Sequence, residues 1–481
     1  MRDLCRYAID AATASGAGYA DARAVSRRAQ QVATKNRAVD SVSDGESEGI
    51  GVRVLVDGAW GFACDRRLSP DGARSAARRA ADFARASSAR SSRRRPVQLA
   101  PVSPAQGEYR TPEGRDPVAV PLAEKLDLCL RAEEEMRHPD VKVTEAMVRA
   151  QREVRAFASS EGADVVQEFV ECGAGIDALA VGDGRAQTRS YPSAHGGSSA
   201  QAGWEYVESL RLADEAPRVA EEAAALLRAD PCPAKVTTIV LDADQMALQV
   251  HESVGHPTEL DRVYGTEAAY AGTSFLAPSD AGALIYGSEL MNVTADATTP
   301  GGLGTFAFDD EGVPARREPI VEGGLLHRFL TSRETAALLG AGEGGSMRAD
   351  GWSRMPLVRM TNLHLEPGDG SLEDLLAEVD DGIFLATNKS WSIDDKRLNF
   401  QFGTQIAWEI KRGALGRILR DATYTGATPA FWASLDAVAG SDEWRLAGLT
   451  NCGKGQPGQH AHVSHGASPA RFRAVQVGVP S

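Results

Sequence analysis

Hydrophobic residues follow two different spacings along the first ninety residues. Helical spacing over residues 2–15, and again after the helix start Ser69-Pro70, predicts two helices. Between them, residues 20–65 alternate polar and apolar positions and are interrupted by Asp-Gly turns, which predicts a meander of β-hairpins. The pattern therefore predicts a small N-terminal α+β domain over residues 1–90.

The composition changes after this domain. Residues 91–114 are rich in Ser, Arg and Pro and cannot bury much apolar surface, which predicts a linker. A nucleic-acid patch is the alternative for the arginines at its start, but no aromatic residues are interleaved with them, which favours a solvated linker. These arginines are Arg90, Arg93, Arg94 and Arg95.

Long alternating runs dominate the next unit, residues 115–229. Runs at 141–160, 165–184 and 199–209 predict strands, and they lie between a helix at 122–137 and a closing helix at 214–230. Strands with one polar face are typical of an antiparallel sheet. An open edge of that sheet could bind an extended peptide, while a sheet that only supports the next domain is an equal alternative.

The remaining residues, 230–481, begin after a Pro-Cys-Pro break and are Gly-rich. Short strands are predicted at 236–243, 357–367 and 470–479. The chain as a whole is therefore predicted to be of the α+β class, with a β-rich C-terminal domain that carries a helix at residues 244–261.

Candidate chemistry lies on this helix, which contains His251, Glu252 and His256. Imidazoles bind zinc, and a glutamate beside the first histidine can act as general base towards a water on the metal, as in HExxH proteases. Histidines five residues apart point about 140° apart on a regular α-helix. Both reach one ion only if the helix ends or distorts, and we expect a π-bulge or break at Gly255.

A catalytic zinc site needs a third protein ligand and leaves one position for water. Cys452 lies in a Gly-rich segment, predicted to be a loop, where Lys454 would favour the thiolate. Three histidines near the C-terminus lie on a polar segment more typical of an exposed loop. Residue types alone leave the third ligand open among Glu259, Asp261, Cys452, His460, His462 and His465.

Charge and cysteine usage narrow the class of protein. The 481 residues carry 52 Lys and Arg against 66 Asp and Glu, a net charge of −14 that disfavours nucleic acid as a partner. Six cysteines lie far apart, and no window approaches the about 18 apolar residues of a membrane span. Asp3 and Asp10 interrupt the stretch where a signal peptide would be apolar. We therefore expect a cytoplasmic protein with reduced thiols and no membrane partner.

The segment HESVGHPTELD resembles the HEAxGHxxExD signature of the TldD/PmbA family of metallopeptidases. The likeness continues through TTPGGLGTFAFDDEGVPARREPIVEGGLLHRFLTS at 298–332, RMTN at Arg359–Asn362 and NCGKGQ at 451–456. Leu260 and Ser253 replace the family's usual Gly and Ala, which bears on substrate choice more than on catalysis. The signature residues that match are His251, Glu252, Gly255, His256, Glu259 and Asp261.

This resemblance implies a zinc-dependent peptidase that cleaves unstructured or modified peptides, with the chain as the TldD-like, motif-bearing subunit. It implies zinc on His251, His256 and Cys452, with Glu252 as the catalytic base. Glu259 and Asp261 are candidates for orienting a ligand imidazole.

The resemblance further implies a dimer, either with a second copy or with a related TldE/PmbA-like subunit. Two other functions remain open at this point. The chain could be a non-catalytic peptide-binding subunit of a protease complex. It could also be a zinc amidase that acts on a small acylated substrate.

Overall fold

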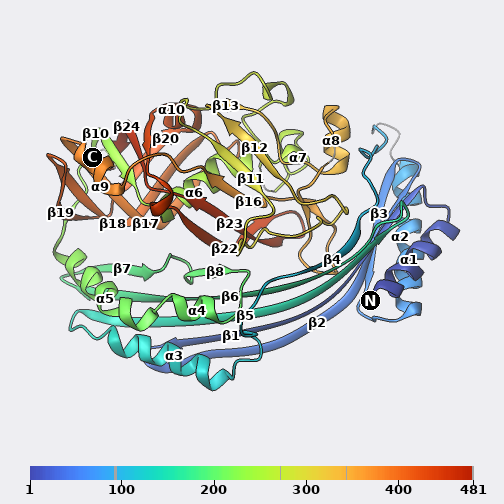
Figure 1. The fold of residues 1–481 in the computed structure, drawn as a ribbon, viewed down its shortest axis with the longest axis horizontal. Helices are drawn as coiled ribbons and strands as arrows, with labels where there is room; N and C mark the ends of the chain where they lie inside the picture. The colour runs from blue at the N-terminus through green and yellow to red at the C-terminus, as the bar shows by residue number, and fades with distance from the viewer. Residues whose placement is uncertain (91–94, 271, 343, 479–481) are drawn as a thin grey trace.

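The computed structural model describes residues 1–90, 95–270, 272–342 and 344–478, and it has the predicted α+β architecture. Figure 1 shows a long curved sheet on one side of the molecule, with the C-terminal domain packed against its inner face. Of the arginine cluster at the start of the predicted linker, Arg93 and Arg94 lie outside the described residues.

The long sheet joins two units that the sequence pattern presents as separate. Its strand order is β3-β2-β1-β5-β6-β4, with β7 and β8 also paired to β6. Antiparallel pairing of β1 with β5, from Asp21↔Ser159 to Lys35↔Glu145, connects the N-terminal hairpins to the central ones. The strands are β1 (Tyr19–Lys35), β2 (Ala38–Val56), β3 (Ala59–Asp65), β4 (Gln106–Arg110), β5 (Val141–Ser159), β6 (Asp164–Gly182), β7 (Arg185–Tyr191) and β8 (Ser198–Ala200).

The predicted linker, residues 91–114, contains one of these strands. Residues Gln106–Arg110 form β4, which pairs in parallel with β6 at the edge of the long sheet. Polar side chains at alternate positions leave this strand mostly exposed, so its composition resembles that of a linker.

Helices cover the outer face of the long sheet in two groups. The helices α1 (Arg2–Ala14) and α2 (Pro70–Arg90) pack at one end, and α3 (Leu122–Glu135) and α5 (Leu212–Arg228) pack at the other. Alanines of α2 lie so close to β3 that a side chain at Gly61 would meet Ala80 O at 2.1 Å. No helix in the described ranges is long and apolar enough to cross a lipid bilayer.

One predicted strand, residues 199–209, is wrong over most of its length. Only β8 is extended, and a short helix, α4 (Glu205–Ser209), follows it. Trp204 and Val207 are both buried, three residues apart as a helix requires. The Glu205 carboxylate accepts backbone N–H groups of Gly114 and Gly203, which holds the chain in this turn.

The C-terminal domain contains two further sheets and a two-stranded ribbon. In the first, pairings β17-β10-β24-β20-β18 close on themselves because β17 also pairs with β18, while the second has the order β13-β12-β11-β16-β23-β22. The predicted strand 357–367 is interrupted and forms β15 and β16. The strands are β9 (Asp230–Pro231), β10 (Lys235–Leu241), β11 (Val293–Asp296), β12 (Arg317–Glu322), β13 (Leu325–Leu326), β14 (Met347–Arg348), β15 (Leu357–Val358), β16 (Asn362–Leu365), β17 (Asp381–Ile393), β18 (Asn399–Lys411), β19 (Ala414–Arg420), β20 (Thr423–Ala427), β21 (Leu435–Val438), β22 (Arg445–Lys454), β23 (Gln459–Ala467) and β24 (Ala470–Val477).

One buried helix, α6 (Ala243–Val250), lies between these two sheets and packs against β17, β23 and β16. The described residues of the domain also form four shorter helices, of which α7 is buried. They are α7 (Leu260–Val263), α8 (Arg333–Leu339), α9 (Leu372–Ala377) and α10 (Thr428–Ala433).

Candidate metal centre

The two motif histidines follow helix α6 directly, where the winding of the chain changes. The first turn of α6 is capped by Asp242, whose carboxylate accepts the N–H of Gln245 at 2.7 Å. Residues His251–Gly255 then form a π-helical turn, and the His256 N–H donates to His251 O, five residues earlier. The rings of His251 and His256 consequently lie side by side, with centroids 4.8 Å apart. The expected distortion is therefore present and is a π-turn.

Gly255 is needed in this turn for space rather than for an unusual backbone angle. Its φ of −59° is helical. A Cβ at this position would lie 2.2 Å from Met360 Sδ, closer than atoms can approach. Glycine therefore lets the π-turn pack directly on the segment between β15 and β16.

The loop predicted around Cys452 is wrong: this residue lies on β22, the last strand of its sheet. Its Sγ is 3.8 Å from His256 Nε2, and the ligand atoms of Cys452, His251 and His256 all lie within 4.8 Å of one another. Burial by itself would raise the pKa of this thiol, but the Arg359 guanidinium and His256 outweigh burial and lower that pKa. The cation that favours the thiolate is thus Arg359, whereas Lys454 faces elsewhere.

Glu259 fixes the orientation of the second histidine. His256 Nδ1 donates to Glu259 Oε2 at 3.0 Å, which leaves Nε2 without a proton and facing Cys452. Lys454 Nζ lies 3.4 Å from the same carboxylate and 2.8 Å from Asp261 Oδ1. Glu259 therefore touches an imidazole as expected, while Asp261 pairs with a lysine and touches none.

His465 orients the first histidine, a contact that sequence reasoning missed. His465 Nδ1 donates to the carbonyl oxygen of Leu363 at 3.2 Å, so its Nε2 must accept the proton of His251 Nδ1, 2.7 Å away. The lone pair of His251 Nε2 is then left for a ligand. In the sequence, the presence of a further histidine near the C-terminus is the one feature that points to such a contact.

The exposed loop predicted for the three C-terminal histidines is wrong, because all three lie on strand β23. His465 is fully buried on the side of β23 that faces α6. His460 and His462 alternate with that side and face the long sheet. A strand with polar residues on both faces resembles a loop in sequence because neither face is continuously apolar.

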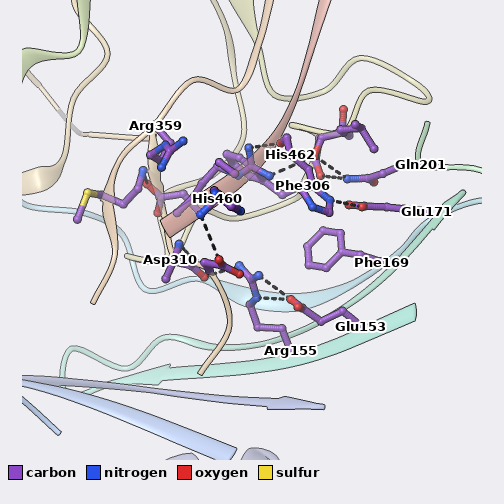
Figure 2. A pocket seen from close by; sticks show the side chains of 18 of the residues that line it. Glu153, Arg155, Phe169, Glu171, Gln201, Phe306, Asp310, Arg359, His460 and His462 are labelled. Atoms are coloured by element: carbon purple, nitrogen blue, oxygen red, sulfur yellow. Dashed lines mark hydrogen bonds and ion pairs between the residues drawn. The ribbon is translucent and has the colours of Figure 1, made fainter. Parts of the chain in front are cut away.

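Figure 2 shows the cavity on this second side, which we call the polar seam. It encloses about 60 Å³ between the long sheet and the C-terminal domain. Its polar side chains are bonded to one another or to the backbone: His462 Nδ1 lies 2.5 Å from Glu171 Oε2, Arg155 Nη1 lies 2.7 Å from Asp310 Oδ1, and Arg155 also pairs with Glu153. Arg348 donates to backbone carbonyl oxygens. The seam is lined by Arg27, Glu153, Arg155, Phe169, Glu171, Asp310, Arg348, Asp350, His460 and His462 among others.

The DDEG segment, Asp309–Gly312, docks the C-terminal domain onto the long sheet beside this seam. Asp310 Oδ1 pairs with Arg155 of β5, and Glu311 Oε1 lies 3.0 Å from Arg53 Nη2 of β2. The Asp309 carboxylate accepts two N–H groups of its own turn, in which Gly312 has a φ of +77°. This motif therefore holds domains together and does not reach the motif histidines.

The motif histidines open onto a separate cavity of about 240 Å³. Glu252 lines it and is 5% exposed, and its Oε2 accepts a hydrogen bond from Arg397 Nη1 at 3.0 Å. Arg397 lies in the turn between β17 and β18. The edge of β22, from Ala447 to Gly453, forms one wall of the cavity.

Comparison with known proteins assigns the chain to a family. Three domain models of the PmbA/TldA metallopeptidases match it: domain 1 over residues 20–84, the central domain over 115–229 and the C-terminal domain over 234–479. The chain belongs to the PmbA/TldD family.

Individual relatives agree with this assignment. A protein of Methanocaldococcus jannaschii named a metalloprotease is 30% identical over 459 residues, which cover 95% of this chain and 96% of the relative. A protein of Saccharolobus solfataricus named a zinc metalloprotease TldD homolog is 26% identical over half of each chain. The crystal structure of TldE from Thermococcus kodakarensis has the same fold, with a TM-score of 0.72 and 16% identity over 99% of both chains.

Proposed function

We propose that this protein is a zinc-dependent peptidase of the PmbA/TldD family, with His251, His256 and Cys452 as the metal ligands and Glu252 as the catalytic base. The observation that carries the proposal is the convergence of three buried donor atoms within 4.8 Å on a cavity that Glu252 also lines.

The donor set fits zinc in its chemistry. Two imidazole nitrogens and one thiolate are ligands that zinc prefers, and three protein ligands leave a fourth position open. Burial lowers the pKa of His251 and of His256, so both rings are neutral near pH 7 and can offer a lone pair. Glu259 and His465 hold these rings with their Nδ1 protons turned away from the site.

A zinc ion held there would supply a Lewis acid that polarises the scissile carbonyl and makes a water molecule more acidic. Glu252 then takes the proton of the attacking water and returns it to the leaving amine. Arg397, 3.0 Å from Glu252, holds this carboxylate at the cavity wall.

A peptide in extended conformation suits the shape of the cavity. Strand β22 pairs with β23 on one side, and no strand in the described ranges pairs with its other side. Near Gly448 this edge is covered by β8, and the Gly448 N–H donates to Ser198 Oγ. Asn451 and Gly453, on either side of Cys452, line the cavity, and we propose that a substrate strand adds to the sheet there. Such binding requires an unfolded segment, so we propose unstructured or modified peptides as substrates.

The family also suggests a partner and a compartment. We propose a dimer, either of two copies or with a TldE/PmbA-like subunit, because the TldE structure has the same fold. We propose the cytoplasm as its location, since Cys452 must stay reduced to bind a metal.

Glu252→Gln tests the base assignment. We expect the variant to bind zinc near one ion per chain by elemental analysis but to cleave a set of unstructured peptides at least about 10²-fold more slowly, because the amide cannot accept the proton. Glu373→Gln, on the exposed surface of α9, is the matched control and should retain full activity.

Three results would contradict the proposal. Full activity of Glu252→Gln would exclude this residue as the base. Zinc binding without cleavage by the wild type, both alone and mixed with a TldE-like partner, would indicate a peptide-binding subunit, and cleavage of acylated amino acids but not peptides would indicate an amidase.

A further inference from the structure

The cavity at the candidate metal centre has a second, acidic end on the same helix. Asp244, Leu248 and His251 lie on one side of α6, and all three line the cavity. Seven residues are two turns, so Asp244 lies about 10 Å from His251 along the helix axis. The cavity thus extends from the metal ligands to a carboxylate that the proposed reaction does not use.

Asp244 forms no ion pair among the described residues, although Arg189 and His195 act on its carboxylate from a distance. Its Oδ2 is shielded from solvent and has no hydrogen-bond partner among the described residues. Ser193 and the backbone N–H of Asn388 bond to the carboxylate, but neither carries a charge. Burial raises the pKa of Asp244 because a buried carboxylate without a counter-ion is unfavourable. A cationic ligand would relieve this penalty.

Residues around Asp244 suit an organic cation. Trp391 is 42% exposed and lines the cavity, so part of its ring is open to a ligand, and an ammonium or guanidinium group binds favourably over such a ring. His195 lies edge-on to this ring at 5.2 Å, and its Nε2 is 3.2 Å from Asn388 Oδ1. The side chains at this end are thus joined to one another, and the Asp244 carboxylate and the Trp391 ring line the cavity without an ion-pair partner among the described residues.

We propose that Asp244 and Trp391 form a subsite that binds a cationic group of the substrate, an ammonium or a guanidinium. This inference rests on the proposed peptidase function and adds a preference to it. The two-turn distance suits the side chain of a Lys or Arg near the scissile bond, which would span from the metal centre to Asp244.

The test compares peptides on the zinc-loaded full-length enzyme. The set contains one unstructured sequence with Lys, Arg or uncharged norleucine at each position in turn, each with a free or acetylated N-terminus, and mass spectrometry locates the cleaved bonds. We expect kcat/KM for the Lys or Arg peptide to exceed that for norleucine about tenfold or more, as for a hydrogen bond to a charged group. A dependence on the free N-terminus alone would overturn the side-chain placement.

Asp244→Asn should bring the ratio of kcat/KM for the Lys peptide to kcat/KM for the norleucine peptide close to one. Asp442→Asn, on the exposed surface, should leave this ratio unchanged. A wild-type ratio near one, with peptides cleaved, would overturn the subsite and leave the peptidase intact. If no peptide is cleaved, the preference of the subsite is measured instead by binding. Fluorescence anisotropy then compares the affinities of the same labelled peptides for zinc-loaded Glu252→Gln. Preferential binding of Lys peptides would support the subsite even though the peptidase fails, and equal binding would overturn it.

Discussion

Strand β23 separates two buried polar regions that have opposite designs. On one side, His251, His256 and Cys452 direct their donor atoms towards one point, and no carboxylate pairs with those donor atoms directly. On the other side, in the polar seam, Arg155 pairs with two carboxylates and His462 contacts a third, at 2.5 to 2.7 Å. The seam has more charged side chains, but they are bonded to one another or, for Arg348, to backbone carbonyl oxygens.

This difference shows which polar clusters can carry chemistry in this protein. Charges that neutralise each other stabilise an interface and leave nothing for a ligand. A histidine is prepared to bind a ligand when one ring nitrogen is held by a hydrogen bond and the other ring nitrogen faces a cavity. We therefore assign binding to the α6 side of β23 and docking to the other side.

The largest expected effect is a loss of zinc affinity when a ligand on the α6 side of β23 is removed. His256→Ala should weaken zinc binding about 10³-fold, because one of three ligands is lost, and should abolish cleavage. Equilibrium dialysis against a zinc buffer measures the affinity. The metal-free variant should still fold, with a lower unfolding midpoint, because a buried ring that contacts Glu259, His251 and Cys452 is lost. Unchanged zinc affinity would remove His256 from the ligand set.

Glu153→Gln tests the seam and should act on stability instead. Burial by itself favours the neutral acid, but Arg155 and Arg27 lower the pKa of Glu153 to about 2. In the unfolded chain this pKa is about 4.3. The pairing therefore contributes stability that is fully present above about pH 5 and is lost as the pH falls towards 2. Urea unfolding at pH 7 should show a loss of about 3 kcal/mol for the variant.

Urea unfolding at lower pH tests the direction of the pH dependence. Between pH 5 and pH 2 the difference between wild type and Glu153→Gln should shrink, because both side chains become neutral. Glu145→Gln is the matched control: it also lies on β5 and pairs with β1 through Lys35, but both side chains are about half exposed. It should unfold as the wild type does. Loss of zinc binding in Glu153→Gln would contradict the division between the two sides.

The smallest effect should distinguish two histidines on one strand. His465→Leu should weaken zinc binding about 10- to 100-fold and shift the absorption spectrum of the cobalt-substituted protein, because His251 loses the acceptor that fixes its tautomer. His462→Leu, three residues away on the seam side, should leave both the affinity and the spectrum unchanged. Equal behaviour of the two variants would show that β23 does not separate the regions.

Local features of the site could be predicted from the sequence. The five-residue spacing of His251 and His256 required a distorted helix, and the structure has a π-turn there. The Asp242 cap and the contact of Glu259 with His256 were also accessible, because each involves residues three apart. Contacts within one turn are determined by residue type and spacing.

Contacts between distant segments could not be predicted in this way. Nothing in the pattern around His465 shows that it faces α6, since neither face of β23 is continuously apolar. Pairing of β1 with β5 across more than a hundred residues is equally invisible, because a strand pattern gives the buried face but not the neighbour. The expected roles of Lys454 and Asp261 changed for the same reason, as these two residues pair with each other.

The sequence by itself determined the α+β class, the extents of α1, α3, α5, β5 and β6, and the distorted winding after α6, all of which depend on local spacing. The family resemblance that its motifs carry selected Cys452 as the third ligand. Only the tertiary structure placed Cys452 on an edge strand beside His256, put His465 behind His251 and left Asp244 without an ion pair in the same cavity. These features depend on which strands become neighbours, and that is decided by packing over the whole chain.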